Sequence, residues 1–64
     1  MISLLVVVHD KTKLAELYTL GTVTYVSDYT RLIGFNCPEA NVDLLRAHPN
    51  VSHVENANTV ILLN

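Results

Sequence analysis

The chain has 64 residues, of which 50% are hydrophobic and 16% are charged, and its formal net charge is −2. This composition argues against intrinsic disorder, and the length limits the chain to one small domain spanning residues 1–64. The four basic residues are too few for nucleic-acid binding through phosphate neutralisation, and the single cysteine excludes an internal disulfide.

The N-terminal segment is almost continuously apolar from Ile2 to Val8. Such a run predicts a strand that is covered on both faces or is central in a sheet. It lacks the basic leader and the small-residue cleavage site of a secretory signal, and it is far too short to span a membrane. We therefore expect a cytoplasmic protein without membrane association, although an excised domain of a secreted protein would have the same features.

A short amphipathic helix is predicted over residues 11–20. Asp10 is expected to cap its first turn, and Gly21 is expected to end it. Its apolar positions, at helical spacing, are Leu14, Leu17 and Tyr18.

The next two segments predict an antiparallel hairpin. Thr22–Val26 is dense in β-branched and aromatic residues, and residues 30–36 supply the second strand after a turn at residues 27–29. Gly34, inside the second strand, indicates a bulge or a close approach of another group to the backbone.

A second helix is predicted after the hairpin. Asn36 or Cys37 is expected to cap it, with Pro38 at its first helical position. Its apolar stripe consists of Val42, Leu44 and Leu45. Pro49 disfavours helical geometry in the residue before it, so the helix is expected to stop by residue 48.

The C-terminal part contains two further strand-like segments. Residues 51–55 predict a short strand, and residues 59–63 form an apolar, β-prone tail. The element order is therefore strand, helix, strand, strand, helix, strand. This order predicts an α+β fold, the ferredoxin-like βαββαβ sandwich, with an antiparallel sheet, two helices on one face and a C-terminal strand-like tail.

Residues that carry catalytic or metal chemistry are scarce. The three imidazoles are His9, His48 and His53, and they lack metal-ligand spacing. Cys37 has no basic neighbour in the sequence, so a small capping or half-buried residue is favoured over a reactive thiol. We expect no enzymatic activity, no cofactor and no metal site.

Two motifs stand in the second half of the chain: a Gly-Phe pair in a central strand, and a Leu-rich helix end followed by a turn and a strand. Their positions are Gly34, Phe35, Leu44, Leu45, Pro49, Val51, Val54 and Glu55. This pattern resembles the propeptide family of subtilisin-like serine proteases, which includes stand-alone protease inhibitors. The opening run at residues 3–9 is similar to the first strand of that family.

The resemblance implies a ferredoxin-like protein that acts by binding. Its sheet would pack on a subtilisin-like serine protease, and its C-terminal tail would occupy the protease cleft as an added strand. The tail residues that the resemblance places in the cleft are Val60, Ile61, Leu62, Leu63 and Asn64.

A second interpretation is a small oligomerising or adaptor protein, of viral or accessory type, with no protease target. The tail at residues 59–63 lacks a clean polar alternation, so both of its faces need cover. A terminal apolar strand at a sheet edge invites pairing with another chain, and pairing with an identical chain gives a homodimer. In a third interpretation, the tail folds back onto its own sheet.

Overall fold

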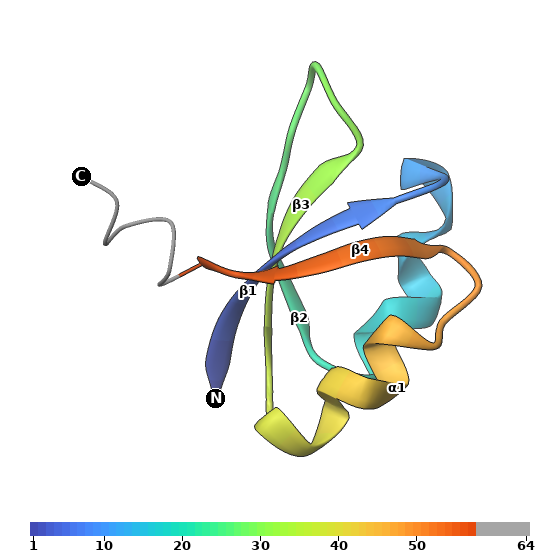
Figure 1. The fold of residues 1–64 in the computed structure, drawn as a ribbon. Coiled ribbons are helices and arrows are strands. Elements are labelled where there is room, and N and C mark those ends of the chain that lie inside the picture. The colour runs from blue at the N-terminus through green and yellow to red at the C-terminus, as the bar shows by residue number, and fades with distance from the viewer. Residues whose placement is uncertain (58–64) are drawn as a thin grey trace.

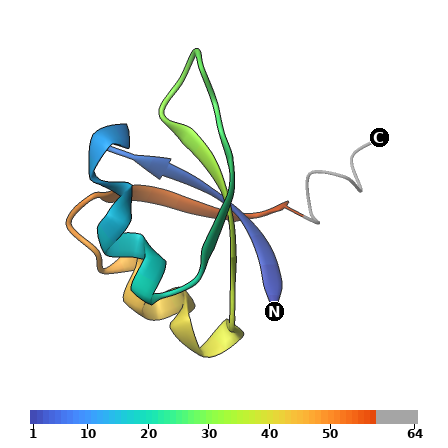
Figure 2. The ribbon, with the colours of Figure 1, turned by 180° about the vertical axis from the view of Figure 1, so that it is seen from behind.

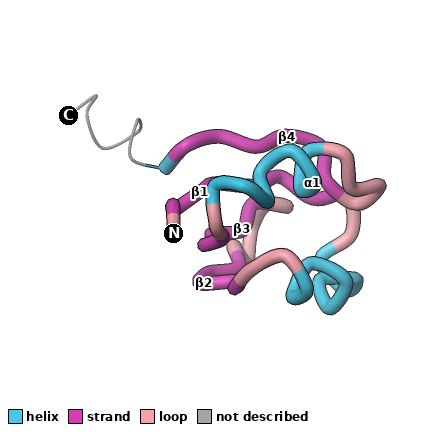
Figure 3. The backbone as a smooth tube through the Cα atoms, turned by 90° about the horizontal axis from the view of Figure 1, so that it is seen from below, coloured by secondary structure: helices cyan, strands magenta, loops and turns pink. Residues whose placement is uncertain are grey.

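The computed structural model describes residues 1–57 of the chain. Its four strands are β1 (Ile2–Val8), β2 (Thr22–Val26), β3 (Leu32–Cys37) and β4 (Val51–Asn56). They form one sheet in the order β2-β3-β1-β4 (Figures 1 and 3), in which all neighbouring strands are antiparallel. The predicted α+β class and antiparallel sheet are therefore confirmed.

Three short helical segments connect the strands. They are the 3₁₀ helix η1 (Lys11–Thr19), the 3₁₀ turn η2 (Glu39–Asn41) and the α-helix α1 (Val42–Arg46). Figures 1 and 2 show these segments on the same side of the sheet. One face of the sheet is thus covered, and the described part of the chain leaves the other face open.

Strand β1 is central, with β3 on one side and β4 on the other. Its side chains alternate between the buried Leu4, Val6 and Val8 and the half-buried Leu5 and Val7. Because successive side chains of a strand point to opposite faces, the first set faces the helices and the second set faces the open side. Of the two predicted settings for this run, the central position is confirmed.

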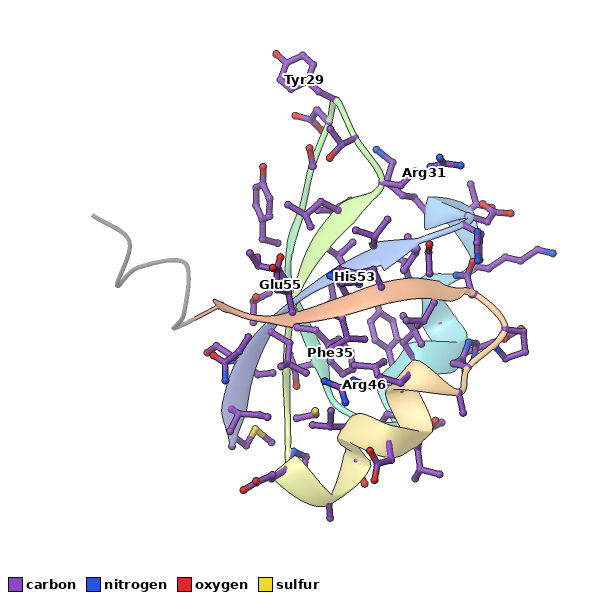
Figure 4. All side chains as sticks on the ribbon, in the orientation of Figure 1. Tyr29, Arg31, Phe35, Arg46, His53 and Glu55 are labelled. Carbon is purple, nitrogen blue, oxygen red and sulfur yellow. The ribbon has the colours of Figure 1, made fainter. Side chains whose placement is uncertain are left out.

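The core lies between the sheet and the helical segments. Phe35, in the middle of β3, is fully buried there (Figure 4). Its fully buried companions are Val6, Val8, Leu17, Ile33, Cys37 and Leu45. These side chains come from β1, η1, β3 and α1, so the helical segments are held to the sheet by shared burial.

Helix η1 has the predicted start but a different geometry. The side chain of Asp10 accepts a hydrogen bond from the Thr12 backbone N–H at 2.9 Å, which confirms the cap. A 3₁₀ helix has three residues per turn, so Leu14 and Leu17 share a face and are both buried. Tyr18 lies one residue further round the helix and is 60% exposed, so its predicted place on the apolar face is wrong.

Gly21 follows the end of η1, as predicted, but for a different reason. No glycine among residues 1–57 has a positive φ, so a left-handed helix stop is absent there. A Cβ at Gly21 would instead collide with the carbonyl oxygen of Asn36 and would lie 2.7 Å from the Cβ of Cys37. Glycine is needed at this position because the chain passes close against β3.

The hairpin of β2 and β3 confirms the prediction made for Gly34. The register of the two strands shifts between Val23 and Tyr25, and Gly34 is paired with Tyr25 directly after this bulge. A Cβ at Gly34 would lie 2.7 Å from the Thr24 hydroxyl oxygen. The second strand begins at Leu32, two residues later than predicted, because residues 28–31 belong to the connecting loop.

The second helix starts later than the sequence predicts. Cys37 does not cap it, because this residue pairs with Ile2 as the last residue of β3. Pro38 is itself the capping residue of η2 and has extended geometry, so its predicted place inside the helix is wrong. The predicted stop is confirmed, since α1 ends at Arg46, ahead of Pro49.

The predicted apolar stripe of this helix is only partly buried. Leu45 is fully buried, and Val42, three residues before it in the sequence, packs against the core. Leu44 is 58% exposed, so its predicted core position is wrong. At 3.6 residues per turn, positions 42 and 45 share a face that position 44 does not.

Candidate protein-binding face

The helical segments leave one face of the sheet, the open face, uncovered in residues 1–57. The side chains of cross-strand partners point to the same side of a sheet, so the strand register identifies the residues of the open face. One row runs from Glu55 through Leu5 and Gly34 to Tyr25. A second row runs from His53 through Val7 to Leu32. We call the residues of these two rows the open face.

The centre of the open face is apolar. Leu5, Val7 and Leu32 are half-buried, although no helical segment covers them. Tyr25 is 57% exposed, and its Cβ would lie 3.3 Å from a Cβ at Gly34, so this residue packs over the glycine backbone. An apolar strip on one sheet face is a common feature of protein contact surfaces.

The β4 side of the open face is polar. His53 and Glu55 are both exposed on β4, next to Val7 and Leu5 respectively, and Figure 4 shows where they lie along this strand. Apolar centres with polar, wet margins are typical of protein interfaces. The open face therefore combines an apolar centre with a polar margin on β4.

The predicted binding residues Val60, Ile61, Leu62, Leu63 and Asn64 lie outside the described residues. The structure does show where the chain leaves the sheet. Asn56, the last residue of β4, is paired with Leu4 near the start of β1. The described chain therefore leaves the sheet from β4, an edge strand directly beside the inner strand β1.

The histidines are held apart by the fold. His9 and His53 are exposed, whereas the Nε2 of His48 lies 3.3 Å from a carboxylate oxygen of Glu16 in η1. The Nδ1 of His48 accepts the backbone N–H of Asn50 at 3.1 Å. The contact with Glu16 joins η1 to the turn before β4, and the hydrogen bond from Asn50 lies within that turn, so both contacts are structural. Among residues 1–57 no group of three or more histidine, cysteine or carboxylate side chains could hold a metal ion.

Cys37 lies in the core and not at a helix end. Its side chain is fully buried, and this burial raises the pKa of the thiol. A raised pKa lowers the thiolate fraction, and the thiolate is the reactive form. The geometry therefore agrees with the predicted unreactive thiol, although the capping role expected for this residue is wrong.

Asn50 is a buried polar residue in the turn before β4. Its side-chain amide donates to the backbone carbonyl of Asp10 and accepts from the backbone N–H of Asp10, both at 2.9 Å. The backbone carbonyl of Asn50 accepts a hydrogen bond from the backbone N–H of His9 at 2.8 Å. Three hydrogen bonds thus tie the start of β4 to the end of β1, forty residues away. The only sequence feature that marks Asn50 is its position directly after Pro49, which does not predict these hydrogen bonds.

No helix in the described part of the chain is long and apolar enough to cross a membrane. The sequence matches no protein-family model and no curated protein.

Proposed function

We propose that the protein is a binding module that docks through its open face onto a subtilisin-like serine protease and inhibits it. The observation that carries this proposal is the strip of Leu5, Val7, Leu32 and Tyr25, which is apolar and is not covered by any helical segment of residues 1–57. The tail would lie in the protease cleft as an added strand, with Val60, Ile61, Leu62, Leu63 and Asn64 as its contact residues.

We also propose that the fold is the ferredoxin-like βαββαβ arrangement. In support, β1 and β2 run in the same direction with β3 between them, and β3 and β4 run in the same direction with β1 between them. Each pair is joined through helical segments on one face, as expected of two interleaved βαβ units.

The residues that carry the family resemblance support the fold more than the docking. Phe35, Leu45, Val51 and Val54 are all in the core, and Pro49 stands in the turn before β4. Of the motif, only Gly34 and Glu55 are on the open face. The protease target therefore depends on the resemblance, whereas binding through the open face depends on apolar side chains that no helical segment covers.

Binding without catalysis belongs to the same proposal. In support, His9 and His53 are separately placed and exposed, and the Cys37 thiol is buried with a raised pKa. A buried free thiol is also in keeping with a reducing compartment, so we propose a cytoplasmic location.

The direct test is to measure the activity of a subtilisin-type protease with equimolar and with excess protein. Inhibition by the intact protein is expected, and deletion of residues 60–64 should abolish it while the circular-dichroism spectrum is retained. Full protease activity alongside undegraded protein would reject the protease target.

A matched pair of tyrosines tests the role of the open face. Tyr25→Glu places a charge on the apolar strip and should weaken inhibition, because the charge would lose its water on docking. Tyr18→Glu is the control, since Tyr18 is 60% exposed against 57% for Tyr25 but lies on η1, away from the open face. Equal inhibition by both variants would exclude this face as the docking surface.

The second candidate function is self-association or adaptor binding with no protease target. The observation that favours it is the sheet order, because β2 and β4 are edge strands with one side unpaired by any described strand. Such edges pair readily with a second strand. Sedimentation should then show a homodimer, and deletion of residues 60–64 should dissociate it if the tail supplies that strand.

A further inference from the structure

A hollow of about 680 Å³ lies at the end of the sheet where the β2–β3 loop approaches β1 and the start of η1. Its lining residues are Val7, Lys11, Asp28, Tyr29, Thr30, Arg31 and Leu32. Figure 4 places Tyr29 at the tip of the β2–β3 loop and Arg31 where this loop joins β3. The hollow is shallow and open to solvent, so a ligand would lie against its wall.

Hydrogen bonds fix the loop that walls this hollow. The buried Ser27 hydroxyl accepts the backbone N–H groups of Tyr29 and Thr30, at 3.3 and 3.2 Å. The Lys11 ammonium donates to the carbonyl of Ser27 at 2.6 Å, which joins the loop to η1. The Arg31 carbonyl accepts from the Val8 backbone N–H at 2.9 Å. The wall is therefore in place before any ligand arrives, which lowers the entropic cost of binding.

The lining combines positive charge with apolar surface. Lys11 and Arg31 are two of the four basic residues of the chain, and they outnumber the single acidic group of the hollow, Asp28. No carboxylate of residues 1–57 forms an ion pair with Arg31. Lys11 donates one N–H to Ser27 and keeps two for another acceptor. Val7 and Leu32, which are paired across β1 and β3, supply the apolar part.

We propose that this hollow binds a small monocarboxylate with an apolar body. The guanidinium of Arg31 has the planar, two-pronged geometry that matches a carboxylate, and Lys11 adds a second donor. The apolar body would lie against Val7 and Leu32, where water would otherwise cover it. This proposal does not depend on the protease target, because the ligand would bind to the protein alone.

The test is an NMR titration of the full chain with hydrocinnamate, using its neutral amide and acetate as paired probes. Hydrocinnamate should shift the backbone signals of residues 28–32 and of Val7 in a saturable way. The amide lacks the charge and acetate lacks the apolar body, so each should bind about tenfold more weakly or worse. Equal affinity for hydrocinnamate and its amide would overturn the proposal.

Two arginine variants locate the site. Arg31→Gln should weaken hydrocinnamate binding by about tenfold, because one charge-assisted hydrogen-bond pair is lost. Arg46→Gln removes the same charge from α1, outside the hollow, and should leave the affinity unchanged. Both arginines are exposed, so both variants are expected to fold. Unchanged binding to Arg31→Gln, or an equal loss in both variants, would contradict this assignment.

Discussion

The two faces of the sheet are built from the same strands but differ in how deeply their apolar side chains are buried. On the face toward the helices, Val6, Ile33 and Phe35 are fully buried. On the opposite face, their chain neighbours Leu5, Val7 and Leu32 are apolar as well, yet remain half-exposed. The contrast teaches that apolar character alone does not place a side chain in the core, because the core forms where helical segments supply the second layer. The open face keeps part of its apolar area in contact with solvent.

The largest expected difference between the two faces is in how much stability is lost when a side chain is truncated to alanine. Phe35→Ala removes a fully buried ring and should lower the free energy of unfolding by about 3–5 kcal/mol. Leu5→Ala removes a half-buried side chain and should cost about 1 kcal/mol. Urea denaturation followed by circular dichroism measures both. If Leu5→Ala costs as much as Phe35→Ala, the open face is buried in the free protein and cannot be a docking surface.

The two glycines give the next largest difference. Gly21→Ala drives a methyl group into the carbonyl of Asn36 and against Phe35 and Cys37, so a loss of about 1–3 kcal/mol is expected. Gly34→Ala meets chiefly the Thr24 hydroxyl, a small side chain that can rotate away, so the loss should be smaller. Thermal melts of both variants test this order, and a greater loss for Gly34→Ala would reverse it.

A smaller effect is expected for Tyr25→Ser on the open face. Tyr25 is 57% exposed, so removing its ring uncovers little buried area and the free energy of unfolding should fall by less than about 1 kcal/mol. Binding of an apolar dye such as ANS should fall if the strip around Tyr25 is accessible. Unchanged dye binding together with a large loss of stability would mean that Tyr25 is a core residue in solution.

The smallest expected effect is on the helix side, at the cap of η1. Hydrogen bonds from the Thr12 hydroxyl and backbone N–H lower the pKa of Asp10 below its usual value of 3.8. A carboxylate with a lowered folded-state pKa stabilises the protein above its unfolded-state pKa, and this contribution is lost as the pH falls through the folded-state pKa. Thermal melts should therefore show a small loss of stability below pH 3.8.

Asp10→Asn is the matched control, because asparagine also caps helices but does not titrate. The acid-dependent loss should be smaller in this variant than in the parent protein. An identical acid dependence would assign the effect to other carboxylates.

Local patterns were enough to predict several elements. The β-branched runs predicted β1 and β2, the hydrogen-bonding geometry of an aspartate predicted the Asp10 cap, and the missing side chain of Gly34 predicted a bulge or close approach. These features depend on interactions within a few residues of chain. The residue pattern of each short segment is therefore enough to predict them.

Other features have no local signal. Leu44 and Leu45 are chemically identical neighbours, and Leu45 is buried because the side of α1 that it shares with Val42 faces the core. Cys37 has the features of a helix cap, but pairing with Ile2 extends β3 through it. The Lys11 contact with the β2–β3 loop joins residues sixteen positions apart, so the hollow beside it was not foreseen.

The sequence by itself determined the α+β class, the antiparallel hairpin and the approximate places where helices begin and end, because each follows from short-range backbone preferences. Only the tertiary structure decided which apolar side chains enter the core, because that depends on which sheet face the helices cover. The same choice defined the open face of Leu5, Val7, Leu32 and Tyr25. Burial is a property of the assembled layers, and no single strand carries it.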